Sequence, residues 1–358
     1  MTNKTSNGKV TTDKLSDQGG IFDVVVRPMF QQGHEGELCS WLKESCLIRT
    51  SLGCPQPNCE NKTLAWSAAR IVDKYNWSCP NCHKRQSIRE GSFFFGLKGD
   101  LKNCLQIILA WCQNIPIEIV ASCLVIYFQH FAEVKEHVVK KVYERCGQVT
   151  ESYVKTHPED FQIGGPGVVL IVDEYPGGLM ATESTTDVLI TKKRNNNFHS
   201  ILCIAEASLV PPRMWLHMMK SMPEPLPKND NNNCEQKCGM VEEAMKEISQ
   251  QVLPGSDLIA NNCARCCNYE SLQDLKQYRV YSVEQLQKLD KSYGNNLMSN
   301  LATIWQIGVA ICEEIQESPH SVGQQIISSY LWRQRFGSVP STAFQYMLNH
   351  IAECYRFN

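Results

Sequence analysis

The stretch GGPGVVLIVDEY, residues 164–175, decides the fold class of this 358-residue chain. Three glycines and a proline mark a turn, and the continuous apolar run Val168–Val172 that follows is typical of a buried strand. Asp173 stands where this run ends. We therefore predict a sheet with an interior strand that leads directly to an acidic side chain.

Further elements are predicted on both sides of this stretch. We expect strands at Val188–Lys192, Ser200–Ala205 and Leu258–Ala260. Residues 208–238 contain five prolines and an Asn/Asp run, which favours a loop or insertion. Apolar periodicity predicts helices at Leu101–Gln113, Pro116–Leu124, Phe131–Tyr153, Met240–Val252, Ala302–Ile315 and Arg335–Phe357, the last after a turn at Gly337–Pro340.

Composition limits the class of protein. Residues 1–150 carry 18 Lys/Arg and 14 Asp/Glu, whereas residues 151–358 carry 17 and 23. Any electrostatic contact with nucleic acid is therefore expected in the first half. The polar N-terminus lacks the apolar core of a signal peptide, and Pro116 and Glu118 interrupt the most apolar stretch. We expect a reducing compartment and no membrane span.

Paired cysteines predict a metal site. Cys54 and Cys59 are followed, after nineteen residues, by Cys79 and Cys82. Two turns that each carry two thiolates can surround one tetrahedral ion, so we predict a structural Zn²⁺ in a zinc ribbon. The first pair is unusually wide, which leaves His83 or Cys46 as a substitute ligand. A second group, Cys234, Cys238, Cys263, Cys266 and Cys267, lacks knuckle-like turns, and we interpret it as buried thiols.

Five blocks in order along the chain resemble the Merlin superfamily of DDE transposases, which carry an ISXO2-like transposase domain. The resemblance runs from about residue 50 to residue 356. After the ribbon, with its tryptophan before the third cysteine, the blocks are SIREGSFF (87–94), IVDEY (171–175), PGSDLIANNC (254–263), NLATIW (300–305) and SYLWRQR (329–335).

The residue patterns and the resemblance together predict an α+β or α/β architecture in four parts. These are a disordered tail at 1–35, a zinc ribbon at 36–99, a helix-turn-helix-like segment at 100–160, and an RNase-H-like domain with a mixed sheet at 161–358. The resemblance also implies a DDE centre, with carboxylates on two strands and one helix. In this sequence the three positions are Asp173, an amide (Asn261, or Asn262 if Cys263 is matched), and Ala302.

Those residues do not supply the ligands of a two-metal centre. Such a centre needs several carboxylates, because Mg²⁺ prefers oxygen ligands and paired cations require compensating charge. Asp257 lies too far along its strand to substitute, and Glu174 should face the opposite side of the sheet. We therefore predict no catalytic Mg²⁺, a degenerate domesticated transposase, and Asp173 as a vestigial position.

The helical segment then becomes the candidate DNA-binding element, since transposases use a helix-turn-helix to hold their terminal repeats. Its third helix carries four cations: Lys135, Lys140, Lys141 and Arg145. An ordinary solvated face with ion pairs one turn apart remains an equal alternative. Lys192, Lys193 and Arg194 are a candidate nuclear-import signal or a contact to backbone phosphates, with a charged hairpin end as the alternative.

Three functions follow from this reading. The first is a non-catalytic nuclear protein that binds DNA or chromatin, with protein partners on its acidic C-terminal half. The second is a protein-interaction scaffold without DNA binding. The third is an active nuclease with a relocated metal site. Salt-dependent DNA binding separates the first two, and metal-dependent nicking identifies the third.

Overall fold

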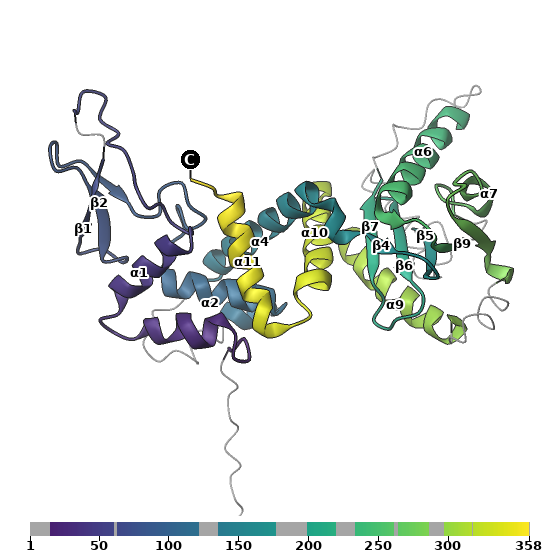
Figure 1. Ribbon diagram of the computed structural model, residues 1–358, viewed down its shortest axis with the longest axis horizontal. Coiled ribbons are helices and arrows are strands. Elements are labelled where there is room, and N and C mark those ends of the chain that lie inside the picture. The colour runs from purple at the N-terminus through teal and green to yellow at the C-terminus, as the bar shows by residue number, and fades with distance from the viewer. Residues whose placement is uncertain are drawn as a thin grey trace, which may run out of the picture. The chain divides into compact units, whose positions relative to one another are not determined.

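The chain forms two compact units in a computed structural model that describes residues 15–60, 63–121, 135–176, 199–219, 233–260, 264–285, 297–316 and 318–357 (Figure 1). The first unit comprises residues up to Tyr153 together with Phe336–Asn358, and the second comprises Val154–Arg335. Within the described residues, no helix combines the length and the hydrophobicity that crossing a membrane requires.

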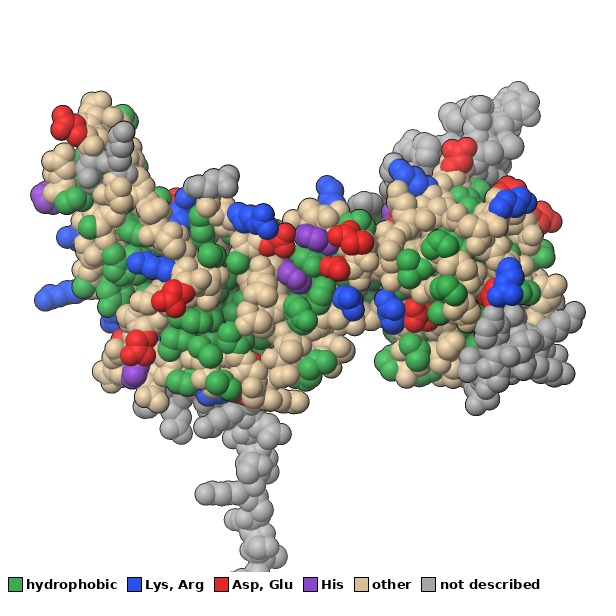
Figure 2. All heavy atoms as spheres, in the orientation of Figure 1, with side chains coloured by type: hydrophobic (Ala, Val, Ile, Leu, Met, Phe, Trp, Pro, Cys, Tyr) green, Lys and Arg blue, Asp and Glu red, His purple; other side chains and the backbone are tan. Residues whose placement is uncertain are grey.

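Helices form the core of the first unit. The helix α2 (Leu101–Cys112) is buried along its whole length, and Asp100 caps its first turn by accepting from the Lys102 backbone N–H at 2.9 Å. The C-terminal helix α11 (Pro340–Cys354) packs against α2. On the face shown in Figure 2, hydrophobic side chains gather in this unit over the region of α2 and α11. The helix α4 (Glu136–Thr156) follows, and residues 117–121 are also helical.

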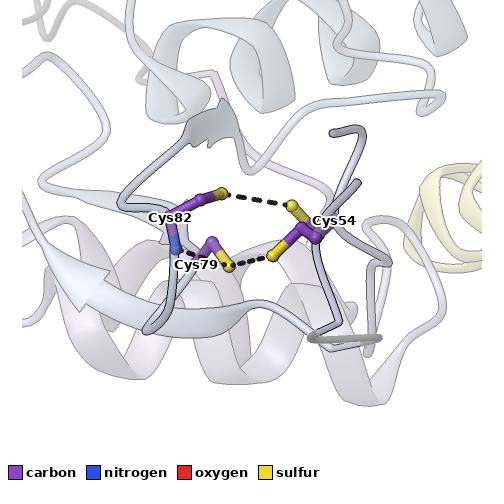
Figure 3. Close-up of side chains that lie close together, drawn as sticks. Cys54, Cys79 and Cys82 are labelled. Carbon is purple, nitrogen blue, oxygen red and sulfur yellow. Dashed lines mark hydrogen bonds between the residues drawn. The ribbon is translucent and has the colours of Figure 1, made fainter. Parts of the chain in front are cut away.

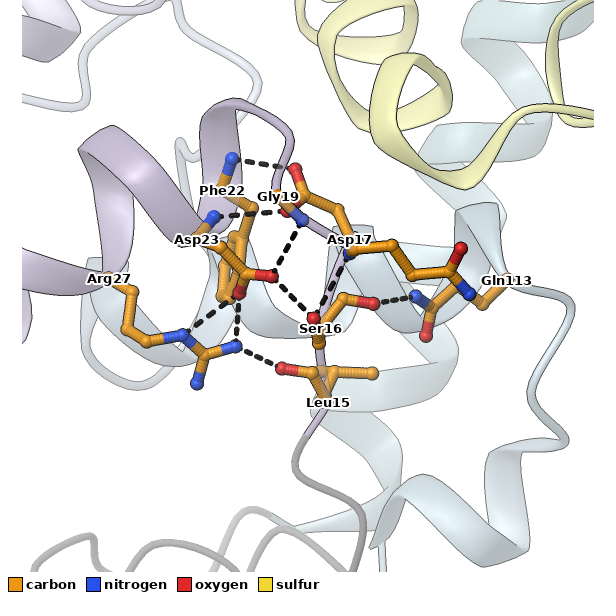
Figure 4. Close-up of polar contacts among 9 residues, drawn as sticks. Leu15, Ser16, Asp17, Gly19, Phe22, Asp23, Arg27 and Gln113 are labelled. Carbon is orange, nitrogen blue, oxygen red and sulfur yellow. Dashed lines mark hydrogen bonds and ion pairs between the residues drawn. The ribbon is translucent and has the colours of Figure 1, made fainter.

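The expected disordered tail at 1–35 is wrong from residue 15 onward. Residues Phe22–Val26 form a π-helical turn and Arg27–Phe30 a 3₁₀ turn, which lead into α1 (Glu35–Glu44). Figure 4 shows how polar contacts fix this segment: the buried Asp17 carboxylate accepts from the Phe22 N–H at 2.7 Å, and Gln113, directly after α2, donates to the Ser16 carbonyl at 2.5 Å. Phe22 is fully buried against Phe344 of α11, with ring centroids 5.2 Å apart. Burial of this aromatic pair outweighs the polar composition of the segment.

A small antiparallel sheet follows α1 in the first unit. It consists of β1 (Ala65–Ala68), β2 (Tyr75–Ser78) and β3 (Arg85–Ser87), in that order. Trp66 pairs with Trp77 across β1 and β2, and their rings meet edge to face at 5.1 Å. Lys43 of α1 places its ammonium 3.5 Å from the centre of the Trp66 ring. A cation–π contact therefore attaches this sheet to α1.

The second unit is built on a mixed five-stranded sheet in the order β10-β9-β5-β6-β7. Every residue of the central strand β5 (Val169–Tyr175) is buried, as expected for a strand covered on both faces. On one side β6 (Ile201–Glu206) pairs antiparallel with β5, and β7 (Met214–Met218) pairs antiparallel with β6. On the other side of β5, β9 (Asp257–Ala260) and β10 (Arg279–Ser282) run parallel. The expected mixed sheet with helices is confirmed.

Helices connect and flank these strands. The helix α6 (Asn233–Gln251) joins β7 to β9, and the short α7 (Tyr269–Leu272) joins β9 to β10. The helices α9 (Leu297–Gln316) and α10 (His320–Phe336) complete the unit. Three short elements accompany them: a 3₁₀ turn at Pro158–Phe161, a 3₁₀ turn at Val283–Gln285, and a parallel pair of β4 (Ile163–Gly164) with β8 (Val252–Leu253).

Three sequence expectations differ from this architecture. The predicted loop at 208–238 contains β7 and the start of α6. The predicted helix Arg335–Phe357 is divided between the end of α10 and α11, and most of α10 was not foreseen. The expected domain at 161–358 ends at Arg335 instead, because α11 packs in the first unit.

Several predicted elements fall outside the described residues. They include the strand Val188–Lys192, the cations Lys192, Lys193 and Arg194, the last three residues of Pro116–Leu124, and the tail before residue 15.

Candidate metal centre

The four predicted ligands come from two turns that flank the small sheet. Cys54 and Cys59 lie in the loop before β1, whereas Cys79 and Cys82 lie in the turn between β2 and β3. Cys79 is buried next to the end of β2, and Cys82 is exposed. The sheet therefore fixes one pair of thiols, and the preceding loop brings the other pair to it.

The turn at Cys79 has a geometry suited to holding an ion. The Cys79 N–H donates to the Lys84 carbonyl at 2.9 Å, and the His83 N–H donates to the Cys79 carbonyl at 3.0 Å. His83 closes the turn with a φ of 55°. The Cys82 N–H points at the Cys79 sulfur, 3.5 Å away. A backbone N–H aimed at a sulfur stabilises the thiolate that a metal needs.

The four sulfurs converge on one point (Figure 3). The Sγ atoms of Cys54 and Cys82 are 3.5 Å apart, those of Cys59 and Cys79 are 3.6 Å apart, and all four lie within 4.8 Å of one another. Tetrahedral coordination with Zn–S bonds of roughly 2.3 Å requires sulfurs about 3.8 Å apart. The predicted convergence is confirmed, and these four cysteines could bind a metal ion.

Crowding of thiols opposes ionisation in the cluster when no cation is bound. The Gln56 backbone N–H lowers the pKa of the Cys54 thiol, but burial and the other three thiols raise it to about 12. A bound cation reverses this balance, because it attracts the thiolates that otherwise repel one another. The two alternative ligands, Cys46 and His83, are not members of the converging group.

The second cysteine group is only partly described. Cys263 and the side chains of Cys234 and Cys238 lie outside the described residues. Cys266 and Cys267 are buried after β9. The Cys266 thiol and burial raise the pKa of Cys267 well above its usual value. Among the described side chains, only the four ribbon cysteines bring three or more candidate ligands together.

Asp173 lies in an environment of buried thiols. It is 2% exposed and pairs in register with Cys203 of β6, whose Sγ is 3.7 Å from Sγ of Cys312 in α9. The Cys312 thiol and burial raise the pKa of Cys203 well above its usual value, and the charge of Asp173 adds to the effect. Thiols are soft ligands, whereas Mg²⁺ prefers oxygen.

Glu174 carries a dense hydrogen-bond network that the sequence did not suggest. Its fully buried carboxylate accepts five hydrogen bonds, including Arg265 Nη2 at 2.5 Å, Ser200 Oγ at 2.7 Å and the Cys266 N–H at 3.1 Å. Burial alone would raise the pKa of Glu174, but Arg265 and Ser200 hold it below the usual value. Glu174 therefore fastens the segment after β9 to the central strand.

Asp257, the carboxylate considered as a substitute ligand beside Asp173, lies away from it along the sheet. Asp257 pairs in register with Val169, four positions before Asp173, so it lies about 13 Å away along the strand. Its carboxylate pairs with Arg279 at 2.6 Å. Asn261, Asn262 and the side chain of Ala302 lie outside the described residues.

The cations proposed for DNA contact differ in what they touch. Arg145 donates to the carbonyl oxygens of Phe93 and, at 2.6 Å, Phe95. Lys140 pairs with Glu136 one turn earlier at 2.8 Å, and both side chains are more than half exposed. Lys135 and Lys141 are exposed. Arg145 therefore has a structural role within the first unit, whereas the three lysines present charge to solvent.

Arg89 of the SIREGSFF block is a buried structural cation that sequence reasoning missed. Its Nε donates to Asp73 at 2.7 Å, and its Nη atoms donate to the carbonyls of Leu97 at 3.0 Å and Gly99 at 2.7 Å. The available signal was an arginine beside the apolar run Phe93–Phe95, because a buried arginine requires several acceptors.

Comparison of the chain with protein-family models, with curated proteins and with solved structures finds no match.

Proposed function

We propose that this chain is a non-catalytic DNA-binding protein of the nucleus that carries a structural Zn²⁺ and derives from a Merlin-type transposase. The observation that carries the proposal is the convergence of Cys54, Cys59, Cys79 and Cys82 on one point. All-sulfur tetrahedral sites are characteristic of structural zinc. Such a site stabilises a ribbon too small to have a substantial apolar core.

Charge supports nucleic acid as the partner of this ribbon. From Ser45 to Gly99 the chain contains eight Lys/Arg and three Asp/Glu. One cation and one anion of this set, Arg89 and Asp73, neutralise each other in the interior. The remaining positive charge attracts a polyanion, and binding would release the counterions condensed on that polyanion. DNA or chromatin is therefore the favoured partner over an uncharged protein surface.

The arrangement of the second unit supports descent from an RNase-H-like transposase domain. The resemblance implies acidic positions on two strands and a helix of a mixed sheet. Here Asp173 lies on the central strand β5, the amide positions directly follow the adjacent parallel strand β9, and position 302 lies in α9. Parallel neighbours end at the same edge of a sheet, so this placement fits the implied centre.

The residues at those positions support a protein without transposase activity. Only Asp173 retains a carboxylate, and it pairs in register with Cys203 of the adjacent strand β6. One carboxylate cannot hold the two Mg²⁺ ions that strand transfer requires. A nuclear location follows from the proposed DNA-binding role.

The test compares two cysteine variants of the full-length protein. We expect one equivalent of zinc by elemental mass spectrometry in the purified protein and in Cys46→Ser, and loss of that zinc in Cys79→Ser. The wild-type protein should bind duplex DNA with an affinity that falls steeply with salt, and Cys79→Ser should weaken that binding because the ribbon loses its fold. A zinc-loaded protein without salt-dependent DNA binding would overturn the proposal in favour of the scaffold function.

A further inference from the structure

The hairpin that joins β1 to β2 ends in a well-defined tip at residues 69–74. The Ala69 N–H donates to the Lys74 carbonyl at 2.7 Å, and the Lys74 N–H donates to the Ile71 carbonyl at 3.1 Å. Lys74 adopts a φ of 60°, which reverses the chain. The tip is therefore a closed turn with its own hydrogen bonds.

The solvent face of this tip combines aliphatic and cationic side chains. Ile71 is 45% exposed and Val72 is 61% exposed. The flanking Arg70 and Lys74 are exposed as well. Single exposed aliphatics are common on protein surfaces, but two adjacent ones at the tip of a hairpin between two cations form a small amphipathic wedge.

The acidic residue of the tip is directed into the protein. The Asp73 side chain is 8% exposed and pairs with Arg89, which is 7% exposed. Arg89 also binds the carbonyls of Leu97 and Gly99. This network removes the negative charge of the tip from the surface and anchors the turn. A preorganised tip loses little conformational entropy when it binds a partner.

We propose that the tip of the β1–β2 hairpin enters the minor groove of duplex DNA. In this arrangement Ile71 and Val72 act as an apolar wedge against the base steps, and Arg70 and Lys74 contact the groove and the adjacent phosphates. Minor-groove proteins combine these residue types, with aliphatic wedges that unstack a step and arginines that enter a narrow groove. The inference rests on the proposed DNA-binding function and names the element that performs it.

Charge complementarity selects DNA as the occupant of this surface. The exposed cations of the ribbon include Arg70, Lys74, Lys84, Arg85 and Lys98. Lys84 and Arg85 lie at the other end of β2 from the tip, so Arg70 and Lys74 are the cations that a polyanion meets there, whereas the aliphatic pair alone would suit an apolar partner equally well.

The experiment measures binding and bending of a 20-base-pair duplex by the full-length, metal-loaded protein. Anisotropy over a range of salt concentrations gives the affinity and the salt slope, and energy transfer between dyes at the two ends gives the bend. The Ile71→Ser/Val72→Ser variant should abolish the bend and weaken binding about 5- to 10-fold. The Arg70→Ala/Lys74→Ala variant should reduce the magnitude of the salt slope by about 2. Netropsin, which fills the minor groove of A/T-rich DNA, should displace the wild-type protein.

Matched controls lie in the second unit. Leu209→Ser/Val210→Ser removes an aliphatic pair in which each residue is 50% exposed, and Lys246→Ala/Lys276→Ala removes two exposed cations. Both controls should bind and bend DNA as the wild-type protein does. Zinc content and the urea midpoint of each variant establish that the ribbon has folded.

The outcomes distinguish this inference from the proposed function. If the wild-type protein binds no duplex, the proposed function fails. If it binds without bending, or if netropsin and the tip variants leave binding unchanged, the DNA-binding function stands and the minor-groove assignment is overturned.

Discussion

Glu174 illustrates how one buried carboxylate organises its surroundings. Its side chain is fully buried, whereas that of its partner Arg265 is 36% exposed. Partial exposure screens the ion pair, so the value of the interaction comes mainly from the hydrogen bonds that the carboxylate accepts. These bonds hold the backbone of Arg265 and Cys266 against β5. Glu174 thereby stabilises the end of the central strand β5 at which Asp173 lies.

Replacing Glu174 with glutamine should destabilise the second unit. We expect Glu174→Gln to lower the free energy of unfolding by about 2 kcal/mol at pH 7, measured by urea denaturation, because an uncompensated cation and weaker acceptors remain. The exposed Glu314→Gln serves as a control and should change stability by less than about 0.5 kcal/mol.

The pH dependence of that difference has a defined sign. The pKa of Glu174 in the folded protein is below the ordinary value of 4.5. Its charge therefore contributes fully above pH 4.5, and the contribution is lost as the pH falls through the folded-state pKa. The stability gap between the wild-type protein and Glu174→Gln should narrow below pH 4.5. A gap that stays constant down to pH 3 would show that the charge of Glu174 contributes nothing.

At the scale of elements, α4 separates structural from solvent-facing cations. Arg145 presents a planar fork to the carbonyls of Phe93 and Phe95, a geometry that lysine cannot reproduce. We expect Arg145→Lys to lower the free energy of unfolding by about 1–2 kcal/mol and to leave the DNA salt slope unchanged, since the charge is retained. Lys141→Ala should do the opposite: its salt slope should fall by about 1, with stability preserved. Reversed results from salt-dependent anisotropy and urea unfolding would make Arg145 the DNA contact.

Elements with strong local signals were predictable from the sequence. The apolar run that became β5 and the periodic pattern that became α2 were placed within two or three residues. By contrast, α10 was missed because its buried face includes Gly323 and Ser328, which weaken the amphipathic pattern. Gly323 serves packing: a Cβ there would lie 3.2 Å from Ile315 and 3.4 Å from Met218. The strand β7 was missed because it lies among prolines, shortly after Pro211 and Pro212, although it pairs with the preceding strand β6.

The candidate site was predictable where spacing alone determines it. The four cysteines could be assigned from sequence because two short turns fix each pair. The surroundings of Asp173 could not, since Cys203 and Cys312 reach it only through pairing across the sheet and through helix packing. Likewise, nothing in the local sequence indicates that Asp73 of the hairpin tip meets Arg89, sixteen residues later in the chain.

For the whole molecule, the division into two units predicts separable responses to metal removal. The cysteine cluster belongs to the first unit, whereas the five-stranded sheet belongs to the second. Chelation with excess phenanthroline should increase hydrogen exchange throughout residues 45–99 and leave β5, β6 and β9 protected. Cys79→Ser should reproduce this pattern without chelator. Loss of protection in β5 on chelation would show that metal binding stabilises both units together.

The last prediction concerns activity: the purified protein should neither cut nor join DNA with Mg²⁺ or Mn²⁺. Strand transfer needs two cations about 3.5–4 Å apart, and their mutual repulsion must be offset by several carboxylates. At the three positions that the resemblance identifies, this chain has Asp173, an asparagine and Ala302. The measurement is release of labelled strand from terminal-repeat-like and random duplexes, with DNA binding verified in the same samples.

The decisive variant restores the implied acids, with Asn262→Asp and Ala302→Glu in one chain. If the wild-type protein is active and Asp173→Asn abolishes that activity, the chain is a functional nuclease. Activity that appears only in the restored variant would identify the missing carboxylates as the cause of its loss.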